Sequence, residues 1–114
     1  QQQQGKVILV GHSRSGVIIS EVAQRIPEKV QLLVYLTAFL VPSGETLSDA
    51  TKKIPRSSEV TVAHLDGTLT LKPDQVISTF YNTTPSEWAE KVPDLLSAEP
   101  ARIYGTALHL TEDR

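Results

Sequence analysis

The chain has no cysteine among its 114 residues, which excludes a disulfide framework, a thiolate metal site and thiol redox chemistry. Its three histidines, His12, His64 and His109, are dispersed and lack the spacing of metal ligands. No apolar run approaches the length of a membrane span, and no secretory leader is visible. The sequence therefore predicts a cytoplasmic protein with no metal, no other cofactor and no membrane partner.

The chain also lacks a large excess of positive or negative charge. The formal net charge is −2, from 11 basic and 13 acidic residues, and the basic residues are scattered along the chain. A nucleic-acid-binding domain would carry a basic stripe or patch, so nucleic acid is not an expected partner. The length allows one domain at most. The partner we expect is a small molecule.

The most informative stretch is an aliphatic run that leads into a turn of small residues. Residues 7–10 (VILV) are typical of a strand buried on both faces of a parallel sheet. Residues 11–15 (GHSRS) then almost match the G-x-S-x-G pattern, with Ser15 in place of the last glycine and Gly16 one position later. This is the pattern of a nucleophile elbow, in which a sharp strand-to-helix turn exposes the hydroxyl of Ser13.

A helix and a second strand follow this turn. Apolar residues recur at helical spacing over residues 17–26, and Pro27 is expected to end the helix. Residues 30–36 form a second buried apolar run. Strand, helix and strand within about thirty residues predict a βαβ unit.

The elbow would need these residue types for catalysis. A serine hydroxyl is a weak nucleophile and must be presented and activated. Gly11 and Gly16 would let strand and helix approach closely, and the N–H of Arg14, at the positive end of the helix, is a candidate oxyanion donor. His12 is expected to pack beneath the turn. The alternative is an ordinary Gly/Ser-rich turn of a doubly wound domain, because short motifs also occur by chance.

The chain resembles the α/β-hydrolases that include plant methyl esterases, hydroxynitrile lyases and their bacterial relatives. The resemblance covers nearly the whole chain beyond residues 1–4. It rests first on VILVGHSRSGVIISEVAQRIPEKV and LVYLTAFLVPSGETL within residues 6–47. Residues 67–71, 80–82 and Pro85 look like the family's cap, and residues 107–111 look like the segment before the strand that carries its acidic triad residue.

The resemblance implies a fold and the positions of the catalytic groups along the sequence. The fold class is α/β: a partial α/β-hydrolase fold, with a βαβ unit of a parallel sheet and a small cap of a hairpin and helices. In this family the triad order is serine, acid, histidine. The acid and the histidine would lie beyond Arg114 and the second oxyanion donor before Gln1, so this chain alone would be inactive. None of its three histidines is expected to be the general base.

The expected organisation has four parts. Residues 1–4, four glutamines, would be an artefactual or disordered lead. Residues 5–44 would form the core βαβ unit, residues 45–110 the cap, and residues 111–114 the return toward the core sheet. Because two parallel strands cannot bury a core alone, either further segments of the protein or other chains of a homo-oligomer must complete the sheet.

Local sequence patterns also predict the secondary structure of the cap. Alternating residues around Asp66-Gly67 predict a hairpin of residues 60–65 and 68–71. A short helix is expected from Pro73, and a second one with Thr84 as its N-cap. Residues 48–58 are expected to be irregular.

Four apolar residues are candidates for a substrate pocket: Phe39, Leu40, Phe80 and Trp88. Phe39 and Leu40 follow the second strand, and loops at the carboxyl ends of parallel strands line the ligand crevice of open α/β sheets. Phe80 and Trp88 are weaker candidates, because they could instead form a small core within the cap.

The resemblance implies hydrolysis of a small apolar carboxylic ester through an acyl-serine intermediate on Ser13. Two alternatives stay open, because a fold does not determine a function. The first is a lyase of the hydroxynitrile type, in which the serine relays a proton. The second is a non-catalytic protein that binds a small molecule on the same fold.

Overall fold

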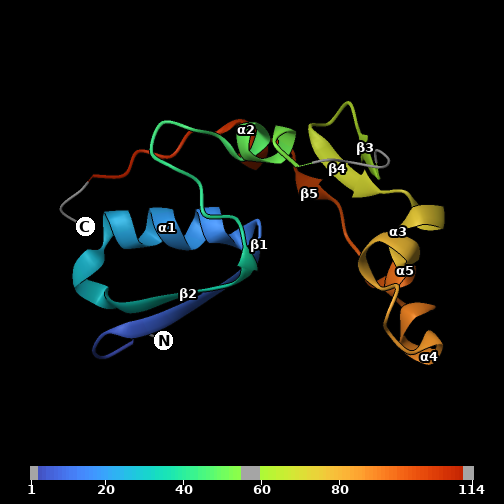
Figure 1. The fold of residues 1–114 in the computed structure, drawn as a ribbon, viewed down its shortest axis with the longest axis horizontal. Coiled ribbons are helices and arrows are strands. Elements are labelled where there is room, and N and C mark those ends of the chain that lie inside the picture. The colour runs from blue at the N-terminus through green and yellow to red at the C-terminus, as the bar shows by residue number, and fades with distance from the viewer. Residues whose placement is uncertain (1–2, 55–59, 112–114) are drawn as a thin grey trace. The chain divides into compact units, whose positions relative to one another are not determined.

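The computed structural model describes residues 3–54 and 60–111, and it divides the chain into two compact units (Figure 1). Unit 1 comprises Gln1–Ile54 and Tyr104–Arg114, and unit 2 comprises Pro55–Ile103. Part of the expected lead, the end of the return segment and Pro55 to Ser58 lie outside the described residues.

Unit 1 contains the predicted βαβ arrangement. Strand β1 (Val7–Ser13) is followed by helix α1 (Ser15–Arg25), the 3₁₀ turn η1 (Pro27–Lys29) and strand β2 (Val30–Ala38). The two strands pair in parallel, and α1 lies along one face of the sheet (Figure 1). Pro27 follows the end of α1 as expected, since a proline disfavours helical backbone in the residue before it. The expected α/β fold class is confirmed.

The core of unit 1 joins segments that are far apart in the sequence. Buried Val17, Val41, Leu47 and Leu108 form one cluster. Leu47 begins helix α2 (Leu47–Lys52), and helix α6 (Arg102–Gly105) precedes the segment that carries Leu108. The main-chain N–H of Gly44 donates to the carbonyl of Leu108 at 2.7 Å, and the Leu108 N–H donates to the Glu45 carbonyl at 3.1 Å.

The boundaries of unit 2 differ from those predicted for the cap, which were residues 45 and 110. Residues 45–54 and 104–111 pack with the βαβ unit, and only 55–103 form unit 2. Helix α2 was not expected, because the sequence predicted irregular structure for residues 48–58. Its N-cap is Thr46, whose hydroxyl accepts from the Asp49 N–H at 3.1 Å while the Asp49 carboxylate accepts from the Thr46 N–H at 3.1 Å. This capping box is a T-x-x-D signal that the sequence analysis missed.

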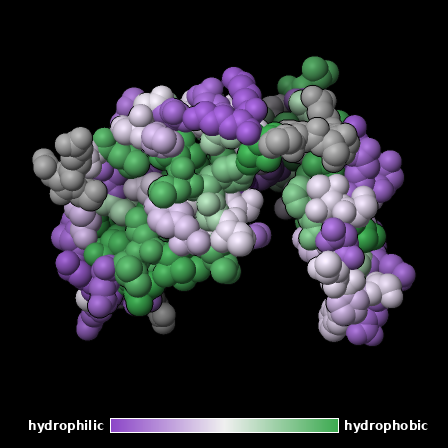
Figure 2. Space-filling view, in the orientation of Figure 1, coloured by the Kyte–Doolittle hydropathy of each residue, from purple (hydrophilic) through white to green (hydrophobic). Residues whose placement is uncertain are grey.

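The face of the sheet opposite α1 is apolar and exposed. The register pairs Ile8 with Leu32 and Val10 with Val34, and all four side chains are exposed. Figure 2 shows hydrophobic side chains gathered over this sheet. Strands of this kind are buried on both faces in complete parallel sheets, which agrees with the expectation that two strands do not suffice.

Unit 2 holds the predicted hairpin. Strands β3 (Thr61–Ala63) and β4 (Thr68–Leu71) are antiparallel, and β5 (Glu99–Pro100) adds a third strand beside β4. In the turn between β3 and β4, the Asp66 carboxylate accepts from the Thr68 N–H at 3.0 Å. The Asp-Gly hairpin is thereby confirmed, with β3 shorter than the run of residues 60–65.

The helices of unit 2 are short. The expected helix from Pro73 is α3 (Pro73–Phe80). The second expected helix is divided into α4 (Ser86–Ala89) and α5 (Val92–Leu95), and its N-cap is Pro85 and not Thr84. Pro93 in the first turn of α5 cannot continue a helix from α4, since it lacks the N–H that an inner helical position needs. No helix of residues 3–54 and 60–111 is long and apolar enough to cross a membrane.

Candidate active site

Ser13 lies at the last position of β1, one residue before Arg14, the N-cap of the helix that begins at Ser15, and its backbone is unusual. Its φ is 54°, in the left-handed region that residues other than glycine rarely adopt. The residue is exposed. Strained backbone of this kind persists only where the surrounding structure imposes it, and it is common at functional sites. The turn predicted from the sequence therefore has the geometry of an elbow with the serine at its apex.

Two glycines permit this turn by close backbone approach. A Cβ added to Gly16 would lie 2.0 Å from the carbonyl oxygen of Phe39, in the loop after β2. A Cβ added to Gly11 would lie 2.9 Å from the carbonyl oxygen of Ser15. Neither contact is sterically allowed, so α1 and the strands meet at a distance that only glycine permits. The close approach expected at Gly11 and Gly16 is present, and their part in an active site stays a prediction.

Arg14 lies between Ser13 and the helix. Its backbone is helical, with φ −62° and ψ −19°, and its carbonyl accepts from the Val17 N–H at 3.1 Å. The first turn of α1 holds no acidic side chain, so this turn itself places no negative charge at the positive end of the helix dipole. An anion that formed beside Ser13 would meet the main-chain N–H groups at this end of the helix.

The strand beside Ser13 contains a second strained residue that the sequence analysis missed. His12 pairs with Leu36 and Ser13 pairs with Ala38, so Thr37 is an extra residue in β2. Thr37 has a φ of 44°, which is rare for a β-branched residue. Bulges of this kind often occur next to active sites, where they redirect the chain. No sequence signal could have revealed it, because threonine is disfavoured in this conformation.

The three histidines are all exposed. His12 was expected to pack beneath the turn, whereas in the described residues its side chain is exposed. It shares the sheet face of Val10 and Leu36, opposite α1, and this face remains exposed in the described residues. His64 lies in the hairpin of unit 2, with its ring Nε2 2.7 Å from the Thr70 hydroxyl.

The four candidate pocket residues have different environments. Phe39 is half-buried and packs against the core cluster of unit 1, whereas Leu40 is 71% exposed. Phe80 and Trp88 are exposed, so they do not form a core within unit 2. Val76 and Ala89 are buried there instead. A role in substrate binding stays a prediction for all four candidates.

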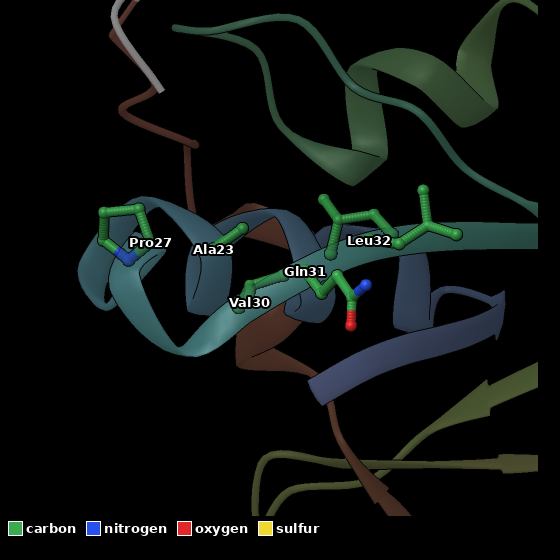
Figure 3. A pocket seen from close by; sticks show the side chains of 6 residues that line it. Ala23, Pro27, Val30, Gln31 and Leu32 are labelled. Carbon is green, nitrogen blue, oxygen red and sulfur yellow. The ribbon is translucent and has the colours of Figure 1, made fainter. Parts of the chain in front are cut away.

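An apolar hollow of about 340 Å³ lies elsewhere in unit 1 (Figure 3). Its lining comes from the end of α1, η1 and the start of β2: Ala23, Pro27, Val30, Gln31, Leu32 and Leu33. Ser13 pairs with Ala38 at the other end of β2. At about 3.3 Å per residue, the length of β2 separates the hollow from the serine. The hollow is therefore not part of the candidate active site.

Known proteins are similar to this chain in both sequence and fold. The chain is 33% identical over 110 residues to the alpha/beta hydrolase nvfD of Aspergillus novofumigatus, covering 88% of the chain and 43% of that protein. The structure matches the crystal structure of the methylesterase MES16 from Arabidopsis with a TM-score of 0.71 and 25% identity, over 99% of this chain and 46% of that one. The chain belongs to the α/β-hydrolases.

Within this family, the chain falls in the branch of the plant methylesterases, as the resemblance implied. Another relative is a carbendazim hydrolyzing esterase of Nocardioides, which is 54% identical over 41 residues, or 36% of this chain and 17% of that protein. No protein-family model matches the chain. This α/β-hydrolase sequence spans less than half the length of the first two relatives.

Proposed function

We propose that Ser13 is the nucleophile of a carboxylic ester hydrolase and that the N–H of Arg14 is one oxyanion donor. The observation that carries the proposal is the exposed Ser13 at φ 54°, held between the end of β1 and the start of α1. Left-handed backbone at a serine in this position presents its hydroxyl outward, beside the N–H groups of the helix. The names of MES16 and of the Nocardioides relative support an ester as the substrate.

The proposed reaction has two steps. The Ser13 hydroxyl oxygen forms a bond to the ester carbonyl carbon, and its proton passes to a histidine outside this chain. The negative charge on the carbonyl oxygen is stabilised by the Arg14 N–H and a second donor. The alcohol leaves with the proton and an acyl-serine remains. Water then cleaves this ester, which releases the carboxylic acid and restores the serine.

A small apolar ester is the proposed substrate, and Phe39, Leu40, Phe80 and Trp88 are proposed to line its pocket. Hydrophobic side chains with few polar groups are typical of small-molecule sites. The cytoplasm is the proposed location, on the sequence argument alone.

The experiment is labelling of the whole protein with a p-nitrophenyl phosphonate ester, which reports p-nitrophenolate release and marks the modified residue for mass spectrometry. We expect one label on Ser13, none in Ser13→Ala, and turnover of p-nitrophenyl acetate that Ser13→Ala abolishes. Ser48→Ala, which alters a serine of α2, is the control and should label like wild type. Equal labelling of Ser13→Ala would exclude the nucleophile, and absence of labelling in wild type would favour a non-catalytic binder.

A further inference from the structure

A buried hydroxyl pair connects β2 to the first turns of α1. Ser20 is only 5% exposed, and its hydroxyl donates to the Gly16 carbonyl at 2.8 Å. The Tyr35 hydroxyl lies 2.7 Å from the Ser20 hydroxyl oxygen. A hydroxyl has one proton, and a carbonyl can only accept. Since the Ser20 proton is committed to Gly16, Tyr35 must be the donor to Ser20.

The hydrogen-bond chain continues through a peptide group toward the site. The Gly16 carbonyl belongs to the same peptide group as the Val17 N–H, and this N–H donates to the Arg14 carbonyl at 3.1 Å. A hydrogen bond to the oxygen of a peptide group polarises the group and strengthens its N–H as a donor. The hydrogen-bond chain therefore runs from Tyr35 through Ser20 and one peptide group to the carbonyl of Arg14, the residue whose N–H is the proposed oxyanion donor.

The hydrogen-bond chain is anchored at Tyr35 and at Gly16. Tyr35 is paired with Gly11 in the register of β1 and β2, so its backbone is held within the sheet. Gly16, whose carbonyl accepts the Ser20 proton, lies so close to Phe39 that an added Cβ would be 2.0 Å from the Phe39 carbonyl oxygen. The hydrogen-bond chain thus links the sheet to the first turn of α1 and to the carbonyl of Arg14, the N-cap residue.

We propose that Tyr35 and Ser20 are positioning residues: by holding the Arg14 carbonyl, they fix the backbone of the residue whose N–H stabilises the transition state. The inference rests on the proposed function of Ser13 and Arg14. An oxyanion donor acts on charge that develops only in the transition state. Loss of its orientation therefore lowers kcat and leaves KM nearly unchanged.

The test compares Tyr35→Phe, Ser20→Ala and the double variant in the whole protein, with p-nitrophenyl acetate as substrate. Tyr35→Phe retains the ring and the Ser20 bond to Gly16, so we expect kcat to fall about threefold. Ser20→Ala breaks the chain and leaves the Tyr35 hydroxyl without its acceptor, so we expect a fall of about tenfold. The double variant should resemble Ser20→Ala, because both changes interrupt one chain.

Leu33→Val is the matched control. Leu33 lies on the same sheet face as Tyr35, two residues earlier on β2, and its truncation loosens the packing against α1 without touching the hydroxyls. We expect Leu33→Val to lower the melting temperature at least as much as Tyr35→Phe while kcat stays at the wild-type value. An equal fall of kcat in Leu33→Val would overturn the positioning role, as would wild-type kcat in Ser20→Ala.

The phosphonate ester separates the two proposals. If wild type is labelled on Ser13 and Ser20→Ala is labelled at the same rate, the proposed function stands and the positioning role is overturned. If wild type is not labelled on Ser13, the proposed function itself fails, and the positioning role fails with it.

Discussion

The main-chain N–H of Phe39 donates a 2.9 Å hydrogen bond to the carbonyl oxygen of Ser13. This carbonyl belongs to the same peptide group as the Arg14 N–H, so the bond helps to orient the proposed oxyanion donor. The Phe39 carbonyl, in turn, is the group that lies against Gly16. The backbone of one residue after β2 thus contacts both the apex of the turn and the start of α1.

Gly16→Ala should destabilise the protein and impair the site. The added Cβ would lie 2.0 Å from the Phe39 carbonyl oxygen, so α1 or the loop after β2 must move. Overpacking against backbone costs about 1–3 kcal/mol or more. We expect thermal unfolding to show this loss and the rate of phosphonate labelling at Ser13 to fall.

Gly105→Ala is the control for this change. A Cβ on Gly105 meets no atom within 4 Å, so stability and labelling should both stay near wild type. If Gly16→Ala behaved like Gly105→Ala, the close approach of α1 to Phe39 would not exist in solution.

At position 37, a glycine variant should be more stable than an alanine variant. At its φ of 44°, a side chain costs about 1–2 kcal/mol that glycine does not incur. We therefore expect Thr37→Gly to be more stable than Thr37→Ala by about 1 kcal/mol in urea unfolding. At Val34, an exposed residue of β2 that pairs regularly with Val10 and has no positive φ, the order should reverse, since glycine weakens an ordinary strand. The same order at both positions would contradict the strained bulge.

The capping box of α2 should make stability depend on pH. Hydrogen bonds from the Thr46 hydroxyl and N–H, with a smaller contribution from Lys52, lower the pKa of Asp49 below its ordinary value of 3.8. A carboxylate with a lowered folded pKa contributes stability above pH 3.8, and this contribution is lost as pH falls through the folded pKa. The difference in melting temperature between wild type and Asp49→Asn should therefore shrink in acid.

Thr46→Ala provides the control for this prediction. It removes the hydroxyl that is the main cause of the shift, so the pKa of Asp49, followed by NMR, should rise toward 3.8. A pKa of Asp49 that is the same in wild type and Thr46→Ala would contradict the capping box.

Sequence alone determined the local structure around the turn and the hairpin. The aliphatic run of residues 7–10 and the apolar spacing after it predict β1 and α1, because these periodicities depend only on which faces are buried. The Asp66-Gly67 pair predicts the β3–β4 turn for a similarly local reason, the positive φ that Gly67 adopts. The same short stretch also predicts Ser13 at the apex of the turn, with Gly11 and Gly16 beside it.

Only the tertiary structure decided which distant residues meet. Leu108 joins Val17 and Leu47 in one core, so residues 45–54 and 104–111 pack with the βαβ unit. Thr37 takes its strained conformation from the pairing of β1 with β2, and Tyr35 reaches Ser20 only because α1 lies across the sheet. These features depend on contacts between segments far apart in the chain, whose energies do not appear in any local pattern of residues.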